Sequence, residues 1–303
     1  MRFLVTGVSG QIGSEAAQRF RKLGDVIAAD RSLLDLSQPS TLAAKLDAMA
    51  PDIIINPAAY TAVDRAEDER DLAFTVNADS PGVMAKWAAA HAVPLVHLST
   101  DYVFDGSGER PWREDDPVAP LSVYGASKLA GEEKVRAAAG PHLIVRTSWI
   151  YSARGANFLR TISRLARERS ELKIVADQIG APTSAAFVAE TLAAIARQNP
   201  ANLGSSFAAA GGRVHVAAGG HTNWHGFASA IVDGLRRLDV TLTVERIIPI
   251  ATKDYPTKAV RPLNSRLDLT RLREGFGIIP PSWDTLLEPE LDALTHPAIV
   301  GKS

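Results

Sequence analysis

Short apolar runs alternate with longer amphipathic stretches through the first half of the chain. Runs of this length are typical of buried strands, and the longer stretches are typical of helices with one apolar face. The runs that we expect to form strands are Phe3–Thr6, Val26–Ala29, Asp52–Asn56, Leu95–Ser99 and Leu143–Arg146. The stretches that we expect to form helices lie near Gln11–Lys22, Leu42–Ala50, Leu72–His91 and Ser122–Ala138. This alternation predicts an α/β fold built on a Rossmann-type, doubly wound parallel sheet.

The pattern loosens after about residue 150. Helices are expected near Asn157–Glu168, Ala185–Gln198 and Trp224–Arg237, and short strands near Lys173–Val175, Arg213–Val216 and Arg246–Ile250. We therefore expect a larger domain of residues 1–150, joined by later segments at about 176–200 and 212–245. Residues 151–303 are expected to form mainly a smaller α/β lobe, and no low-complexity linker separates the two parts.

Composition narrows the class of protein. The 303 residues are 46% hydrophobic and 22% charged, which fits a globular protein with a real core. A net charge of -1 gives no electrostatic footprint for nucleic acid or an anionic membrane. The chain has no cysteine, so thiol catalysis and cysteine-ligated zinc are excluded. The apolar start, Phe3–Val5, is too short for a signal peptide or a membrane span, and we expect a cytoplasmic protein.

A glycine-rich turn follows the first expected strand. Gly7, Gly10 and Gly13 have GxxGxxG spacing and come directly before a helix. Glycine allows the tight turn and the close approach of backbone to a diphosphate, whose charge meets free N–H groups at the helix start. A purely structural turn is the alternative, but the strand–turn–helix context at the start of the chain favours a dinucleotide.

Two neighbouring residues give opposite cues about that dinucleotide. Asp30 follows the second strand, where an acidic side chain would bind the adenosine ribose of NAD. Arg31 would instead favour the 2′-phosphate of NADP. We expect either cofactor to be used. Asp35 and Leu36 are expected to cover the adenine, with a surface turn as the alternative.

A Tyr-x-x-x-Lys sequence supplies candidate chemistry. Tyr124 and Lys128 lie four residues apart on an expected helix and therefore share one face. A nearby ammonium favours the ionised form of a phenol, so Lys128 is expected to keep Tyr124 acidic and to hold the ribose hydroxyls. Thr100, at the end of the fourth strand, would hydrogen-bond a substrate carbonyl while Tyr124 supplies the proton. A surface pair on an exposed helix is the alternative interpretation.

Seven segments, in order along nearly the whole chain, resemble the extended short-chain dehydrogenase/reductase superfamily and, within it, the dTDP-4-dehydrorhamnose reductase family. The Asp-Gln-x-Gly-x-Pro-Thr and Arg-Pro-x-Asn-Ser segments are far more restrictive than the glycine spacing. The segments are Gly7–Gly13, Asn56–Asp64 with Ser99–Phe104, Tyr124–Glu132, Arg146–Tyr151, Asp177–Thr183 and Arg261–Ser265.

The resemblance implies NADPH- or NADH-dependent reduction of the 4-keto group of dTDP-4-dehydro-L-rhamnose, a step of dTDP-rhamnose biosynthesis. It implies that Thr100, Tyr124 and Lys128 are catalytic and that Thr100, Asp101 and Trp149 contact the sugar, although Trp149 could instead be a core aromatic. The residues then expected to bind the cofactor are Gly7, Gly10, Gln11, Ile12, Gly13, Asp30, Arg31, Asp35, Leu36, Ala59, Tyr60, Thr61, Tyr124 and Lys128.

The resemblance also implies a homodimer and a magnesium ion held by glutamates at a dimer contact. Glu15 and Glu190 stand at matching positions, while Glu288, Glu290 and Asp292 compete for the third place. Exposed glutamates are usually solvated surface, so the sequence favours no firm metal site. The expected partner is a nucleotide sugar, with neither nucleic acid nor membrane.

Two other functions compete with this interpretation. A related nucleotide-sugar dehydratase or epimerase has the same fold, but a dehydratase of this class carries Thr-Asp-Glu, and Tyr102 stands here in the place of that glutamate. A non-catalytic, cofactor-binding regulatory subunit is the second alternative. The presence of Thr100, Tyr124 and Lys128 favours an enzyme. The sequence fixes neither the nucleotide on the sugar nor the choice between NADH and NADPH.

Overall fold

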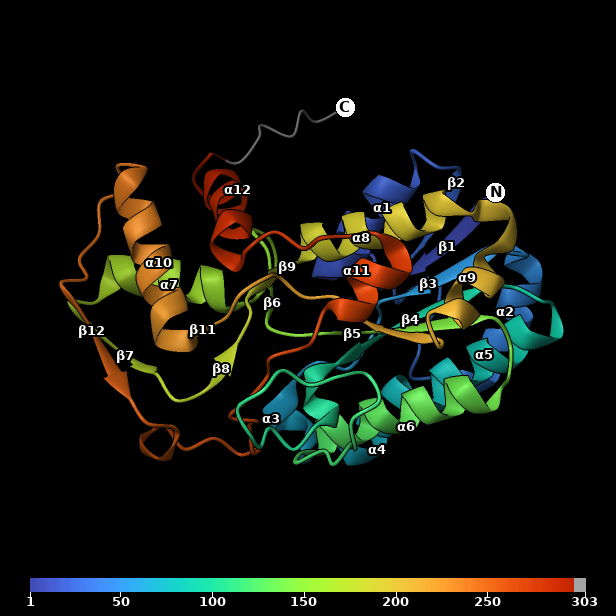
Figure 1. The fold of residues 1–303 in the computed structure, drawn as a ribbon, viewed down its shortest axis with the longest axis horizontal. Helices are drawn as coiled ribbons and strands as arrows, with labels where there is room; N and C mark the ends of the chain where they lie inside the picture. The colour runs from blue at the N-terminus through green and yellow to red at the C-terminus, as the bar shows by residue number, and fades with distance from the viewer. Residues whose placement is uncertain (297–303) are drawn as a thin grey trace.

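Six parallel strands form the centre of the molecule in the computed structural model, which describes residues 1–296 (Figure 1). Their order across the sheet is β10-β5-β4-β3-β1-β2, and every pairing is parallel. The strands are β1 (Arg2–Thr6), β2 (Asp25–Ala29), β3 (Ile53–Asn56), β4 (Leu95–Thr100), β5 (His142–Thr147) and β10 (Arg213–His215). Because β1 lies between β2 and β3, the strand order changes direction there, and ligands of open α/β sheets bind at such a point.

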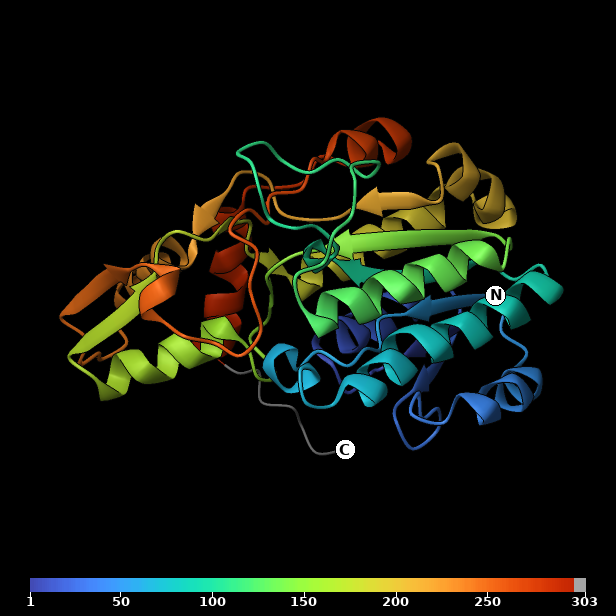
Figure 2. The same cartoon turned by 90° about the horizontal axis from the view of Figure 1, so that it is seen from below.

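Helices cover both faces of this sheet (Figures 1 and 2). The helices of this part are α1 (Gln11–Phe20), α2 (Leu42–Met49), α3 (Val63–Ala66), α4 (Arg70–Phe74), α5 (Ser80–Ala90), α6 (Val123–Ala137), α8 (Ala185–Gln198), α9 (Leu203–Ala209) and α11 (Thr270–Phe276). Alternate strand residues point to opposite faces. Thus Phe3 and Val5 pack in one core with α1, α8, α9 and α11, while Leu4 packs in a second core with α2, α5 and α6. The predicted doubly wound fold is confirmed.

The helix expected over Leu72–His91 is divided into three parts. A π-helical turn, η2 (Thr75–Asp79), separates α4 from α5. Pro81 explains the break, because it has no N–H for the carbonyl of Asn77 and its ring would crowd that carbonyl. The side chain of Asn77 accepts a hydrogen bond from the Tyr60 N–H at 2.8 Å and donates to Ser127 at 2.9 Å. The turn therefore ties the loop after β3 to α6.

A smaller lobe has its own apolar core. Three helices surround it: α7 (Phe158–Glu168), α10 (Trp224–Arg237) and α12 (Trp283–Thr295). Its strands form two-stranded sheets. These pairs are β7 (Glu171–Val175) with β12 (Arg246–Ile250), β8 (Ile179–Gly180) with β11 (Thr222–Asn223), and β6 (Ile150–Tyr151) with β9 (Thr183–Ser184). In Figures 1 and 2 this lobe lies at one end of the long axis.

The two ranges expected to return to the larger domain behave differently. In 176–200, α8 packs against α1 over the large sheet. The range 212–245 is split: β10 pairs with β5 of the large sheet, whereas α10 packs against α7 in the smaller lobe. The apolar face of α10, with Phe227 and Ile231, is buried in that lobe's core. The sequence pattern showed a helix here without showing which sheet it would cover.

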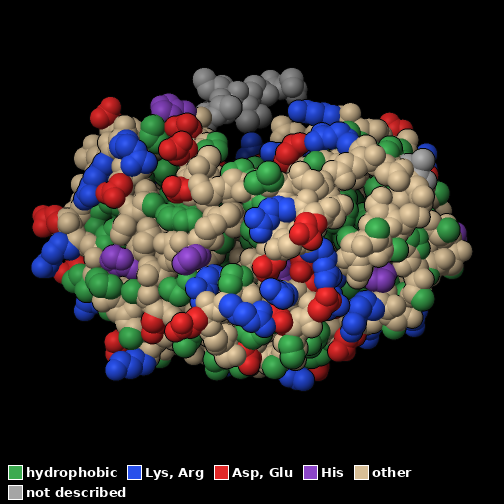
Figure 3. Space-filling view, in the orientation of Figure 1, with side chains coloured by type: hydrophobic (Ala, Val, Ile, Leu, Met, Phe, Trp, Pro, Cys, Tyr) green, Lys and Arg blue, Asp and Glu red, His purple; other side chains and the backbone are tan. Residues whose placement is uncertain are grey.

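The sequence did not predict α9, α11, α12 or the two-residue strands. The first two helices are only seven residues long, and α12 contains Pro289. Positive and negative side chains are interspersed over the face seen in Figure 3, in keeping with the near-zero net charge. Within residues 1–296, every helix is too short or too polar to cross a bilayer.

Candidate active site

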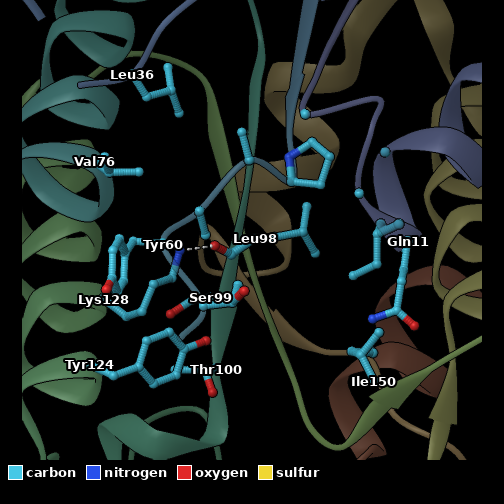
Figure 4. Close-up of a pocket in the computed structure, with 18 of the residues that line it drawn as sticks. Gln11, Leu36, Tyr60, Val76, Leu98, Ser99, Thr100, Tyr124, Lys128 and Ile150 are labelled. Carbon is cyan, nitrogen blue, oxygen red and sulfur yellow. Dashed lines mark hydrogen bonds between the residues drawn. The ribbon is translucent and has the colours of Figure 1, made fainter. Parts of the chain in front are cut away.

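A cavity of about 860 Å³ opens at the carboxyl ends of the large sheet's strands (Figure 4). It receives residues from the loops after β1, β2, β3 and β4, from α6, and from the start of the smaller lobe. The sequence-predicted residues that line it are Gly7, Gly10, Gln11, Ile12, Gly13, Asp30, Arg31, Asp35, Leu36, Ala59, Tyr60, Thr61, Thr100, Asp101, Tyr124, Lys128 and Trp149. The fold thus brings together residues that are up to 142 positions apart in sequence, from Gly7 to Trp149.

The glycine turn has no room for side chains at two of its three positions. Gly7 has a φ of +58°, and a Cβ there would lie 2.9 Å from Ala58. A Cβ on Gly13 would lie 2.1 Å from the carbonyl oxygen of Gly7. Helix α1 begins at Gln11, and its N-cap, Gly10, places no side chain over the helix start. The turn therefore exposes backbone at the cavity wall, as a diphosphate requires.

The carboxylate of Asp30 already accepts hydrogen bonds from residues of its own loop. The donors are the Ser32 hydroxyl at 2.6 Å, the Ser32 N–H at 2.9 Å and the Leu33 N–H at 3.2 Å. The bond from Ser32 contributes most to lowering the pKa of Asp30, so the group is ionised at neutral pH. Arg31 is 77% exposed, with its Nε 3.4 Å from Asp35. The structure therefore keeps both Asp30, the cue for NAD, and Arg31, the cue for NADP, at the cavity.

The end of β4 presents a hydroxyl and a buried carboxylate. The Thr100 hydroxyl donates to Asp101 at 3.0 Å and accepts from the Tyr102 N–H at 3.2 Å. Asp101 is only 2% exposed, and burial raises its pKa to about 6, although hydrogen bonds from Ser265 and Thr100 lower it in part. This carboxylate consequently titrates closer to neutrality than an ordinary aspartate.

Tyr124 is brought to the cavity because the start of α6 lies close to the end of β4. Ser122 caps the helix by accepting from the Gly125 N–H at 3.2 Å. A Cβ on Gly125 would lie 2.2 Å from the Tyr102 carbonyl oxygen, so only glycine lets the helix come so near. The ring of Tyr124 meets that of Tyr102 edge-on at 5.5 Å. In Figure 4 the Tyr124 phenol points toward Thr100 across the cavity wall.

The phenol of Tyr124 is less acidic than expected, because its pKa is raised and not lowered. Burial raises the pKa of Tyr124 to about 12, and a hydrogen bond with Thr100 offsets only part of this. Lys128 donates from Nζ to the Leu98 carbonyl at 2.6 Å (Figure 4). Burial also lowers the pKa of Lys128 to about 8, with Glu132 acting against the shift. Desolvation by the surrounding protein is therefore the largest effect on the pKa of both groups.

A buried ion pair fastens α6 to the sheet beneath the site. Arg146 and Glu132 are 0% and 1% exposed, and two bonds of 2.8 and 2.6 Å join them. Ser99 donates to the same carboxylate at 2.6 Å. Since Ser99 precedes Thr100, this network fixes the helix that carries Tyr124 relative to the strand that carries Thr100.

Sequence reasoning missed Asn157, which also lines the cavity. Its side chain caps α7 by accepting from the Arg160 N–H at 3.1 Å and donates to the Gln11 side chain at 2.8 Å. It therefore links the smaller lobe to the glycine turn. An Asn before an amphipathic stretch is a recognisable cap signal, but the contact with Gln11 spans 146 positions and leaves no local pattern.

The predicted magnesium residues lie outside the cavity, and the group does not fit them. Both carboxylates are already paired with arginines: Arg19 Nη1 is 2.5 Å from Glu15 and its Nε is 3.2 Å from Glu190, which also lies 2.7 Å from Arg197. Glu290 instead accepts from the Ala153 N–H at 2.6 Å, and burial raises its pKa. In residues 1–296 no group of three acidic or histidine side chains is arranged to hold a metal. We derive no step through a metal ion.

Comparison with known proteins identifies the family. Residues 1–296 match the family described as "RmlD substrate binding domain". The chain is 46% identical to the dTDP-4-dehydrorhamnose reductase of Burkholderia thailandensis, over 93% of this chain and 95% of that one. It is 40% identical to the enzyme of that name from Salmonella typhimurium, over 94% and 95% of the two chains.

Solved structures agree with this. The crystal structure of a dTDP-4-dehydrorhamnose reductase from Clostridium acetobutylicum has a TM-score of 0.88 and 34% identity, and the match covers 97% of this chain and 100% of that one. The enzyme from Bacillus anthracis, solved in complex with NADP, has a TM-score of 0.86 and 34% identity, over 95% and 98%. The chain therefore belongs to the RmlD family, that of the dTDP-4-dehydrorhamnose reductases.

Proposed function

We propose that this protein reduces the 4-keto group of dTDP-4-dehydro-L-rhamnose to give dTDP-L-rhamnose, using NADPH or NADH. One observation carries the proposal: Thr100, Tyr124 and Lys128 line the same cavity as the glycine turn, in a member of this family. A phenol, an ammonium and a hydroxyl beside a dinucleotide cradle are the groups that carbonyl reduction needs.

The cradle fits a nicotinamide dinucleotide. Gly7 and Gly13 leave no room for side chains, and no side chain caps the start of α1. The backbone N–H groups there are therefore open to a diphosphate. Asp30 and Arg31 would meet the adenosine ribose or its 2′-phosphate, and Lys128 the ribose beside the nicotinamide. When bound, the cofactor supplies the hydride that adds to the carbonyl carbon. The relative from Bacillus anthracis, solved with NADP, supports this class of cofactor.

Tyr124 gives the proton. Its pKa of about 12 keeps the phenol protonated at neutral pH, the form that can protonate the substrate oxygen as negative charge develops there. Thr100 hydrogen-bonds the same oxygen and holds the carbonyl near the phenol. Burial penalises the phenolate left behind, and in this proposal the ammonium of Lys128, one helical turn along α6, would offset part of that penalty.

The sugar lies between the strand ends and the smaller lobe in this proposal. Asp101 and Trp149 line the cavity and would contact the sugar. We assign cofactor binding to residues 1–150 with α8 and β10, and sugar binding mainly to the lobe of residues 151–303. Asp101, with its pKa near 6, would bind sugar hydroxyls most strongly when ionised.

We further propose a homodimer in the cytoplasm, where nicotinamide cofactors and nucleotide sugars are supplied. The family resemblance supports the dimer, and its test is the mass of the purified protein by light scattering. A monomeric mass at micromolar concentration would overturn it. Fractionation of cells that express the protein tests the location.

The function is tested by supplying dTDP-4-dehydro-L-rhamnose with NADPH or NADH and following the loss of reduced-nicotinamide absorbance. Turnover with formation of dTDP-L-rhamnose is expected. If other 4-keto nucleotide sugars are reduced and this one is not, the substrate assignment is wrong. Tight cofactor binding without turnover of any keto sugar would point to a regulatory subunit.

A further inference from the structure

The Asp177–Thr183 motif has no part in the chemistry above, although it is among the most restrictive segments of the chain. Asp177 and Gln178 are absent from the cavity wall, and so is Trp224. The segment lies between β7 and β9 in the smaller lobe, beside the start of α10 (Figure 1). Its contacts lead to one cavity residue, Trp149.

Trp149 has a strained backbone. Its φ is +50°, in the left-handed region that bulky residues rarely adopt. Such strain costs about 1–3 kcal/mol and persists only where the surroundings enforce it. Trp149 also lines the cavity, and its carbonyl accepts from the Thr183 N–H at 3.1 Å. The conformation is therefore held by contacts with the motif segment and has a place in the site.

The indole of Trp149 is stacked on a second indole. The rings of Trp149 and Trp224 are 3.6 Å apart with an angle of 8° between their planes. Among residues 1–296 no other pair of tryptophans is stacked. Trp224 also packs on Phe158, the first residue of α7, with the ring centroids 4.6 Å apart. Trp224 therefore lies behind Trp149, outside the cavity lining, and is supported by helix α7 of the same lobe.

A chain of hydrogen bonds fixes Trp224. Its indole N–H donates to the Gln178 side-chain oxygen at 3.0 Å. The Gln178 amide donates to the Thr252 hydroxyl at 3.1 Å, and Thr252 donates in turn to Asp177 at 2.6 Å. Gln178 is only 5% exposed. The polar part of the motif thus sets the position of an indole that has a single N–H to satisfy.

The glycine of the motif makes room for the stack. A Cβ on Gly180 would lie 2.5 Å from Cε2 of Trp149, a distance that real Cβ atoms do not reach. Gly180 also pairs with Thr222, two residues before Trp224. Gly180 on β8 therefore lies beside β11, which leads directly into Trp224 at the start of α10, and the two residues together define where the Trp149 ring can be.

We propose that Trp224 and Gln178 are positioning residues that hold Trp149 in its strained conformation as the sugar-contacting wall of the cavity. The inference rests on the proposed function for the identity of the sugar. Gly180 provides the space, Trp224 the stacking surface and Gln178 the anchor. The motif then acts on the reaction without touching the substrate.

Trp224→Leu and Trp224→Phe test the stack in the full-length protein. Two indoles stacked at this distance couple their transitions, and with their long axes turned relative to one another in the stacking plane the native protein is expected to show an exciton couplet in circular dichroism. Both variants should abolish it. An aromatic pair adds about 0.5–1.5 kcal/mol, so Trp224→Leu should raise KM for the nucleotide sugar up to ~10-fold. Trp224→Phe keeps a ring under Trp149 but loses the N–H that binds Gln178, so its KM should rise, and by less than that of Trp224→Leu.

Gln178→Met tests the anchor, since the side chain keeps its length and loses both hydrogen bonds. A single lost hydrogen bond is worth about 0.5–1.5 kcal/mol, so KM for the sugar should rise roughly 2- to 10-fold, with the couplet altered in size. The Kd for NADPH should stay within ~2-fold in these variants, because the glycine turn is not involved.

Trp283→Leu is the matched control. Trp283 packs on Phe227 in the same lobe but is not in contact with Trp149. This variant should lower stability and leave the couplet and the sugar KM unchanged. Equal effects of Trp283→Leu and Trp224→Leu on KM, or an intact couplet in Trp224→Leu, would overturn the positioning role.

Trp149→Leu separates the inference from the proposed function. Loss of the couplet together with a raised sugar KM supports both. Loss of the couplet with an unchanged KM removes Trp149 from the sugar site, and the positioning role with it, while turnover by the native protein keeps the reductase assignment. Failure of the native protein to reduce any keto sugar, with the couplet present, overturns the proposed function alone.

Discussion

The two lobes hold their sides of the cavity by different means. In the large domain, the buried ion pair of Arg146 and Glu132 joins α6 to the sheet, and Gly125 lets that helix reach the strand end. In the smaller lobe, stacked aromatic rings do the corresponding work, with Trp149 on Trp224 and Phe158 behind them. The buried ion pair fixes the direction of the hydrogen bonds at the strand end. The aromatic stack fixes the position of one wall of the cavity.

The difference follows from the proposed task of each side of the cavity, which is proton transfer in the large domain and sugar binding at the smaller lobe. Proton transfer needs donor and acceptor within hydrogen-bond reach, and a fully paired buried network supplies such geometry. A sugar presents hydroxyls and an apolar face, for which a rigid aromatic wall is sufficient. The comparison predicts that changes in the large domain act on turnover and folding, whereas changes in the smaller lobe act on sugar affinity.

Replacing Tyr124 by Phe should have the largest effect. The phenol proton is lost while the ring and its contact with Tyr102 remain. A positioned acid contributes roughly 10²- to 10⁴-fold, so kcat should fall by at least ~100-fold with NADPH affinity little changed. Steady-state kinetics and a fluorescence titration measure the two quantities. Near-native turnover would remove Tyr124 from the proposed role.

Breaking the buried ion pair of Arg146 and Glu132 should have the second-largest effect, which is on the free energy of unfolding. Arg146→Met leaves the Glu132 carboxylate uncompensated in the interior, which typically costs about 3–5 kcal/mol of unfolding free energy. Urea denaturation measures it. In the smaller lobe, Arg246 is 72% exposed in its pair with Glu171, so Arg246→Met should cost less than ~1 kcal/mol.

The double variant Glu132→Leu with Arg146→Met sharpens this test. Removal of both charges should recover most of the loss, because neither is left unpaired. If the double variant is as unstable as Arg146→Met alone, the cost comes from packing and not from the isolated carboxylate.

Activity should fall at alkaline pH through Lys128. Its folded pKa is lowered to about 8, so the ammonium is present below that pH and lost above it. The value of kcat/KM should decrease by about tenfold per pH unit above pH 8, since this ratio reports ionisations of the free enzyme. His97 stays neutral throughout, because burial and then the charge of Lys128 hold its pKa well below the usual range. A flat profile to pH 10 would contradict this role of the ammonium.

The smallest effects should come from the two helix caps. Ser122→Ala and Asn157→Ala each remove an N-cap, worth about 1 kcal/mol of stability. Only Asn157 also bonds Gln11, so its loss should additionally weaken NADPH binding. Denaturation and cofactor titration of the pair check this, and equal cofactor affinities would exclude the link between the lobes.

The sequence predicted the large sheet well, and in the smaller lobe it predicted α7, α10, β7 and β12 but missed α12 and the two-residue strands. Each of the first five strands was placed to within a residue or two, because a strand covered on both faces is a continuous apolar run between turns. The smaller lobe's strands are mostly two residues long, which leaves no period to detect. The π-helical turn at Thr75–Asp79 depends on Asn77 meeting Tyr60 and Ser127 and was equally hidden.

The sequence by itself determined the glycine turn, the Tyr124–Lys128 pair and the strand ends, since these depend on local spacing and on the rule that parallel strands end at one edge. Tertiary structure decided the ionisation of the site and the shape of its sugar wall. Lys128 could not be seen to bond the Leu98 carbonyl, nor Trp149 to rest on Trp224, from residues so far apart. Burial sets the pKa of Tyr124, and burial is a property of the whole packed chain.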